Sequence, residues 1–178
     1  MRYTLSLTFY YVGAYAFITG SPFVYIRYYH VDPQHYGWLF ALNIVGVMAM
    51  SAVNRRLVQR HALEQLLKYA TMLAALAAVA LALLVKLEIG GFIAIIITVF
   101  LLFSMNGIIA ATSTAAALDA APNIAGSASA LIGSLQYGSG IISSLLLARL
   151  SDGTPWTMAW IIALFTLMSA ALVFRDKQ

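Results

Sequence analysis

Six apolar stretches divide the sequence, and each is long enough to cross a lipid bilayer. A transmembrane helix needs about 20 apolar residues to cross a hydrocarbon core about 30 Å thick. Because backbone groups in lipid must bond within their own segment, we expect every stretch to be helical. The chain is 62% hydrophobic and 9% charged, which suits a membrane protein better than a soluble domain. The predicted spans are about 4–26, 34–53, 66–85, 91–118, 124–150 and 155–174.

These spans predict an all-α membrane protein with a single six-helix transmembrane domain over residues 1–178. Two of the predicted helices have clear start signals, since Asp32 precedes Pro33 and Thr154 precedes Pro155. A capping side chain followed by a first-turn proline is typical of a helix N-terminus. We expect no soluble domain and no long linker. With no cysteine, the chain has no disulfide framework and no cysteine-based metal site.

The basic residues indicate topology rather than nucleic-acid binding, because they lie beside the ends of apolar runs and not on one face. A cytoplasmic N-terminus places seven lysines and arginines on the cytoplasmic side and three on the other. The seven are Arg2, Arg55, Arg56, Arg60, Lys68, Arg175 and Lys177, and the three are Arg27, Lys86 and Arg149. The positive-inside rule therefore predicts that both termini are cytoplasmic. We expect a multi-pass inner (plasma) membrane protein.

The fifth span, with the residues before it, is unusually small and polar for a membrane helix. One helical stripe consists of Gly126, Ala130, Ser134 and Gly138, and a second of Ser129, Gly133, Gln136, Gly140 and Ser143. Small residues every fourth position predict a groove where another backbone comes close. The second stripe has two interpretations, since its polar groups can hydrogen-bond to adjacent helices or line a cavity.

Three amide side chains in the middle of spans are the strongest candidates for contact with substrate or cavity water: Asn43, Asn106 and Gln136. An amide in hydrocarbon costs free energy unless it meets a partner or water. The predicted cavity also includes Ser113, Tyr137 and Phe17. Aromatic residues on the first span, with Tyr137 on the fifth, either form apolar walls of a pocket or pack against helices and lipid. Those on the first span are Tyr10, Tyr11, Tyr15, Phe17 and Phe23. Gly20 and Pro22 are predicted hinge residues in the first span.

The six spans also suggest a 3+3 internal repeat. Spans two and five both place an amide near glycine, Asn43 with Gly46 and Gln136 with Gly138, whereas spans three and six are more uniformly apolar. Three-span units have opposite orientations, so the repeat would be inverted, as in many secondary transporters.

Catalytic and metal chemistry find little support in the sequence. His30, Asp32 and His35 share a loop but match no metal-ligand spacing, so we assign no metal site. Gly138-Ser139-Gly140 lacks the partners of a nucleophile elbow, and no phosphate-binding glycine loop is present. We therefore predict that the protein is not an enzyme.

Three segments resemble the C-terminal half of a major facilitator drug transporter. They are PNIAGSASALIGSLQYGSG in the fifth span, TGSPFVYI in the first, and the loop VNRRLVQRHALEQLL after GWLFALNIVG. The chain is most similar to the bicyclomycin-resistance group of drug:proton antiporters. The resemblance implies half of a major facilitator fold, with spans one, two, four and five around a central cavity and spans three and six outside it.

By the same resemblance, the complete transporter would export small drug-like compounds against proton entry and use no other cofactor. We expect the missing wall of the cavity to come from an N-terminal half or from a second copy of the chain. No acidic residue lies in the middle of a predicted span, so a proton-carrying acid is expected in that missing half.

Two alternatives remain open from the sequence. The chain could be a truncated or split half-transporter without transport of its own. It could also be a structural or assembly protein whose small-residue faces bind other membrane helices.

Overall fold

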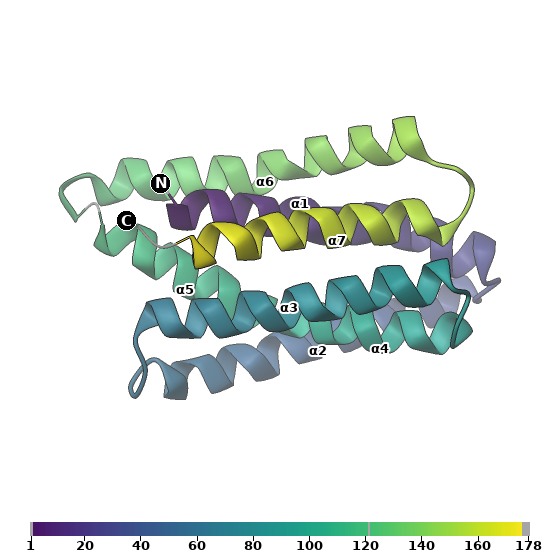
Figure 1. Ribbon diagram of the computed structural model, residues 1–178, viewed down its shortest axis with the longest axis horizontal. Helices are drawn as coiled ribbons and strands as arrows, with labels where there is room; N and C mark the ends of the chain where they lie inside the picture. Colours follow the sequence, from purple (N-terminus) through teal and green to yellow (C-terminus); the bar gives the residue numbers. More distant parts are fainter. Residues whose placement is uncertain (1, 121, 176–178) are drawn as a thin grey trace.

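The computed structural model describes residues 2–120 and 122–175, which form helices joined by short turns (Figure 1). The helices are α1 (Arg2–Pro22), the π-helix η1 (Phe23–Tyr28), α2 (Pro33–Leu57), α3 (Leu63–Lys86), α4 (Gly91–Ser104), α5 (Asn106–Asp119), the 3₁₀ helix η2 (Pro122–Ile124), α6 (Ala125–Leu150) and α7 (Pro155–Phe174). Within the described residues, five helical segments are long and apolar enough to cross a membrane: 33–57, 63–86, 91–119, 122–150 and 155–174. The prediction of an all-α membrane protein is confirmed.

Helix α1 is not among these five segments, and its position explains why. It packs against α7, α6 and α5, so much of its surface meets protein and not lipid. It can therefore carry buried hydroxyl groups, such as that of Ser6, whose Oγ donates to the Ser169 carbonyl at 3.0 Å. With η1, α1 runs from Arg2, which contacts Glu64 and Arg175, to Tyr28, which lines a hollow at the opposite end.

The helices pair in a pattern with internal symmetry. Helix α1 packs on α7 and α6, whereas α4 and α5 pack on α3 and α2. The remaining main pairs are α3 with α7 and α1 with α5. Exchanging α1 with α4–α5, α2 with α6 and α3 with α7 converts the α1–α7 pair into the pairs of α3 with α4 and α5, and the α1–α6 pair into those of α2 with α4 and α5. The α3–α7 and α1–α5 pairs are unchanged by this exchange. This is the packing that a 3+3 inverted repeat produces.

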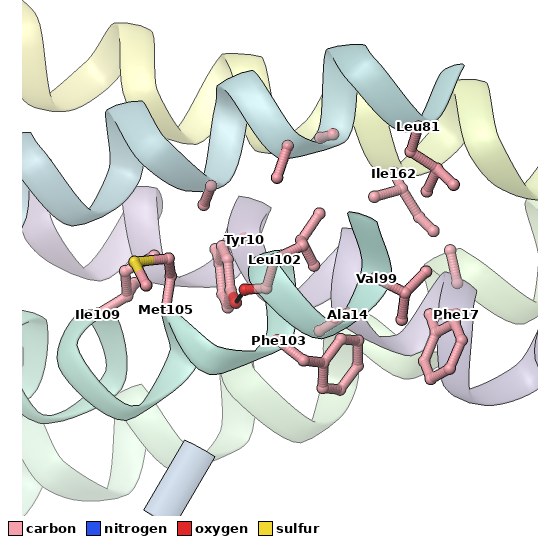
Figure 2. Close-up of a cluster of buried hydrophobic side chains, with 14 of the residues drawn as sticks. Tyr10, Ala14, Phe17, Leu81, Val99, Leu102, Phe103, Met105, Ile109 and Ile162 are labelled. Atoms are coloured by element: carbon pink, nitrogen blue, oxygen red, sulfur yellow. Dashed lines mark hydrogen bonds between the residues drawn. The ribbon is translucent and has the colours of Figure 1, made fainter. Parts of the chain in front are cut away.

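The core lies where α1, α3, α4 and α7 meet (Figure 2). Phe17 is fully buried, with its ring centre 4.8 Å from that of Phe103 and 6.0 Å from that of Tyr25. The fourth predicted span is interrupted at Met105, between α4 and α5. Beside this interruption the buried Tyr10 hydroxyl donates to the Leu102 carbonyl at 2.9 Å, which satisfies an acceptor near the end of α4.

Helices α2 and α6 flank this core and lie at opposite edges of the molecule in Figure 1. Within α2, only Asn43, Gly46 and Asn54 are buried. Within α6, only Ile132, Ser139 and Ser143 are buried. Most of both helices is therefore available to lipid or to another protein chain.

Both predicted helix starts are confirmed. The Asp32 side chain accepts from the Gln34 N–H at 2.8 Å, and the Thr154 hydroxyl accepts from the Trp156 N–H at 3.2 Å. The first span changes from α1 to the wider π-helix η1 directly after Pro22, which has no N–H to donate. Gly20 packs close to Met158 on α7, since a Cβ there would lie 3.1 Å from the Met158 side chain. Whether Gly20 and Pro22 act as a hinge stays a prediction.

Candidate functional site

Five side chains from three helices form what we call the polar cluster: Tyr11 and Tyr15 on α1, Asn106 on α5, and Gln136 and Tyr137 on α6. The Tyr11 phenol lies near the side chains of Asn106, Gln136, Tyr15 and Tyr137. The Tyr11 and Tyr15 ring centres are 6.1 Å apart. Residues far apart in the sequence are thus grouped around a single phenol.

The close packing of α6 on α1 brings Gln136 to Tyr11. One helical turn beyond Gln136, Gly140 lies against the Tyr15 ring, which a Cβ at Gly140 would approach to 3.4 Å. A further turn along, the Ser143 hydroxyl donates to the Val12 carbonyl of α1 at 2.6 Å. Spacings of four and three residues keep these positions on one helix face. This part of the predicted second stripe therefore faces α1.

Contacts between α2 and α5 fix the position of Asn106. A Cβ on the next residue, Gly107, would lie 2.7 Å from the Ser51 backbone nitrogen and would also collide with the Val47 carbonyl. Only glycine allows the two backbones to approach this closely. Five residues further along α5, the Thr112 hydroxyl lies 3.5 Å from the Asn54 side-chain oxygen of α2. Helix α5 is therefore held against α2 while its Asn106 side chain faces α1.

Two buried acceptors on α5 lack a hydrogen-bond partner among the described residues. They are Oδ1 of Asn106 and Oγ of Ser113, which lie about two helical turns apart on the same face. Buried polar atoms are almost always hydrogen-bonded, so an exception needs a physical explanation. Asn106 as a whole is half-buried, although its Oδ1 is covered, whereas Ser113 is fully buried.

The polar cluster opens to the surface of the molecule. The Tyr137 side chain is 72% exposed, and the other four members are half-buried. Amide and phenol groups can both donate and accept hydrogen bonds, and the aromatic rings add apolar contact surface. The polar cluster therefore presents hydrogen-bonding groups and apolar surface on one partly exposed face.

The structure brings together three of the six predicted cavity residues: Asn106, Gln136 and Tyr137. It places Phe17 in the packed core and not in the polar cluster. Asn43 is 4% exposed, and its amide donates to the Leu39 carbonyl of its own helix at 3.3 Å. Ser113 shares a face with Asn106 but is covered.

The sequence alone does not single out Tyr11 and Tyr15, because tyrosine is common throughout the first span. Tyr11 could have been identified by its position opposite Asn106 and Gln136. That position is known only once the pairing of the helices is known. The predicted groove on α6 is also not filled by this chain. In the described structure nothing lies within 4 Å of a Cβ added to Gly126 or Gly138.

Comparison with known proteins gives two curated relatives. Over 97% of its length the chain is 31% identical to a bicyclomycin resistance protein homolog of Haemophilus influenzae, of which it covers 42%. Over 82% of its length it is 30% identical to an uncharacterized MFS-type transporter, YdgK, of Bacillus subtilis, of which it covers 36%. No family model matches the chain.

The chain thus spans about two fifths of the length of these curated relatives, and both are named for transport or drug resistance. The similarity agrees with the helical membrane fold and with the resemblance found in the sequence. Over nearly its whole length, the chain is similar to part of a bicyclomycin resistance protein homolog and part of an MFS-type transporter, as expected for the C-terminal half of a major facilitator drug exporter.

Proposed function

We propose that this chain forms one wall of the substrate path in a transporter that exports small, partly apolar compounds. The observation that carries the proposal is the grouping of Asn106, Gln136 and Tyr137 around Tyr11, on a face that is only partly covered. Polar groups inside a membrane are costly unless they meet a partner or water. The buried Asn106 oxygen lacks a partner among the described residues, and in this proposal it accepts a hydrogen bond from a substrate or from cavity water.

In this proposal, the second wall of the path comes from another six-helix half, either in a longer chain or in a second copy. The chain covers only 42% of the Haemophilus influenzae relative, and the flanking helices α2 and α6 are largely uncovered. We infer an inner-membrane location with both termini cytoplasmic.

We also infer that export is coupled to proton entry and that the carrier acid lies in the other half. Among the described residues, the acidic groups sit at helix ends or in turns. They are Asp32, Glu64, Glu88, Asp119 and Asp152. None of them is placed to carry a proton through the middle of the bundle.

The proposal can be tested in a chimera in which this chain replaces the matching segment of the Haemophilus influenzae relative. The readout is the bicyclomycin resistance of cells that lack their own exporters. We expect Gln136→Ala or Asn106→Ala to reduce export about tenfold, the effect of losing one or two hydrogen bonds to substrate. The control is Gln59→Ala, an exposed amide in a turn outside the cluster, with protein level measured for every variant.

Unchanged resistance in both cluster variants would remove these residues from the substrate path. An inactive chimera that is present at normal level would contradict the assignment of this chain as a transporter half. If the chain is inactive alone but active in the chimera, the half-transporter form of the proposal is supported.

A second candidate function is that of an assembly protein for other membrane helices. It is favoured by the open first stripe on α6, where a Cβ added to Gly126 or Gly138 would meet no atom within 4 Å in the described structure. A single cysteine at Ser134, between these glycines, should then crosslink to a stable partner in cells. Such a crosslink without any drug-dependent phenotype would favour assembly over transport.

A further inference from the structure

A hollow of about 410 Å³, here called the end hollow, lies at one end of the bundle, apart from the polar cluster. It is enclosed by the end of η1, the turn between α3 and α4, and the start of α7. Its charged and aromatic lining residues are Tyr28, Tyr29, Lys86, Glu88, Asp152 and Trp156. The apolar part of its wall includes Leu84, Val85 and Ile89.

The cation and the aromatic rings of the end hollow are arranged together. The Lys86 ammonium lies 4.9 Å from the centre of the Trp156 ring, a cation–π contact that holds the lysine at the wall. The Tyr28 and Tyr29 rings are 5.0 Å apart and nearly perpendicular. Tyrosine and tryptophan favour the headgroup region of a bilayer, which is where the ends of membrane helices lie.

Hydrogen bonds hold one of the two carboxylates in place. Oδ1 of Asp152 accepts from the Thr154 N–H at 2.9 Å, the Thr154 hydroxyl at 2.8 Å and the Thr157 hydroxyl at 2.9 Å. These bonds, that of the Thr154 hydroxyl first, lower the pKa of Asp152 below its usual range, so the group is ionised at neutral pH. All of these hydrogen bonds end on Oδ1, which leaves Oδ2 able to accept from a ligand.

The second carboxylate, Glu88, lies on the turn between α3 and α4. Its backbone has a φ of 55°, in the left-handed region that is uncommon for residues other than glycine. In the described part of the chain, neither of the two ion pairs involves Glu88, Asp152 or Lys86. Two carboxylates and one ammonium thus line one hollow without an ion pair among these three residues.

This set of groups fits a zwitterion better than a simple ion. An anionic ligand would meet two carboxylates, and a purely cationic ligand would meet the Lys86 ammonium. A ligand with a primary ammonium a few atoms from a phosphate can satisfy both, because ammonium donates to carboxylates and lysine pairs with phosphate. The apolar wall suits the first carbons of attached acyl chains.

We propose that the end hollow binds the ethanolamine phosphate headgroup of a phospholipid. Glu88 and Asp152 accept hydrogen bonds from the ammonium, and Lys86 pairs with the phosphate. The bound lipid then bridges η1, the α3–α4 turn and the start of α7. This site does not depend on which compounds the protein transports.

The experiment is native mass spectrometry of the purified chain with equal amounts of phosphatidylethanolamine and phosphatidylglycerol. We expect the wild-type protein to retain mainly phosphatidylethanolamine. Glu88→Gln removes one charged acceptor without changing the size of the side chain, and should weaken retention about tenfold. Asp32→Asn is the matched control, because Asp32 is an exposed carboxylate before α2 that does not line the hollow, and asparagine also caps helices.

Equal retention of the two lipids, or unchanged retention in Glu88→Gln, would overturn the proposal. Adding free phosphoethanolamine at the same concentration as the lipid tests whether the end hollow binds a lipid headgroup or a soluble amine phosphate. We expect it to leave the bound lipid in place, since it lacks the acyl chains. Displacement at equal concentration would assign the end hollow to a soluble amine phosphate instead. Elution of each variant at the wild-type position shows that the fold is kept.

Discussion

Tyr10 stabilises the fold where the fourth predicted span is interrupted. Its hydroxyl is fully buried and donates to the Leu102 carbonyl, close to the position where α4 ends and α5 begins (Figure 2). We expect Tyr10→Phe to lower the free energy of unfolding by about 1–3 kcal/mol, because it leaves that buried carbonyl without a donor. The measurement is unfolding of the purified protein by titration with a denaturing detergent.

Tyr137→Phe serves as the control for this substitution, since the Tyr137 side chain is 72% exposed. It should change the free energy of unfolding by less than about 0.5 kcal/mol. Equal effects of the two substitutions would contradict a special role for the Tyr10 hydroxyl.

Gly107 is required by the contact between two backbones. A methyl group there would meet the Val47 carbonyl and the Ser51 nitrogen of α2, neither of which can move without shifting the helix. We expect Gly107→Ala to destabilise the protein by about 1–3 kcal/mol, the usual cost of overpacking. Because Gly107 follows Asn106, the same substitution should also reduce export by the chimera.

Gly133→Ala provides the matched control, because nothing lies within 4 Å of a Cβ at that position on α6. Alanine there should be neutral or slightly stabilising, since it favours a helix over glycine by about 1 kcal/mol. If Gly107→Ala proves as mild as Gly133→Ala, α2 and α5 do not pack as closely as the structure indicates.

The start of α7 depends on the turn that precedes it. The Asp152 carboxylate accepts hydrogen bonds from Thr154 and Thr157, which lower its pKa below the unfolded value of about 3.9. Its contribution to stability is therefore present above that unfolded value and is lost as the pH falls through the lower folded pKa. Because the group is largely exposed, we expect the contribution to be less than about 1 kcal/mol at pH 7.

Comparing Asp152→Asn with the wild type by thermal unfolding between pH 7 and pH 3 tests this contribution. The variant should be less stable at pH 7, and the difference should shrink at the acidic end of the range. A difference that stays constant over the whole range would show that the charge of Asp152 is not what stabilises the turn.

The features of the helices that could be predicted from the sequence are local ones. Asp32 with Pro33 and Thr154 with Pro155 correctly mark where α2 and α7 begin, because capping involves residues two positions apart. Helix pairing could not be predicted in the same way. Lipid and neighbouring helices are both apolar, so periodicity does not say which face of a membrane helix is covered.

The candidate site shows the same division between local and distant information. Gln136 stands out in the sequence as an amide in a membrane helix. Its contact with Tyr11 depends on how α6 packs on α1 and is visible only in the structure. For Phe17 the sequence favoured a cavity position, but close packing with Phe103 and Tyr25 places it in the core.

The molecule as a whole has two chemically different ends. Arg2 donates to the Arg175 carbonyl at 2.9 Å and pairs with Glu64 at 2.8 Å. The start of α1, the end of α7 and the start of α3 therefore lie side by side. The basic turn after α2 lies at this same end, since it leads directly into α3. The opposite end holds Lys86 and the carboxylates of the end hollow. This distribution of charge is the one that would set orientation in a membrane.

The orientation can be tested through the basic residues Arg55, Arg56 and Arg60. With both termini cytoplasmic, the seven-to-three excess of basic residues would fall to four against three if these arginines were replaced by glutamine. We therefore expect the wild type to insert in one orientation and the triple glutamine variant to insert in both. With green fluorescent protein fused to the C-terminus, the fluorescence of the variant should be about half that of the wild type. Replacing the three arginines by lysine keeps the charge and should keep the single orientation. If the lysine variant loses fluorescence as well, side-chain contacts of these arginines and not their charge would determine how the chain inserts.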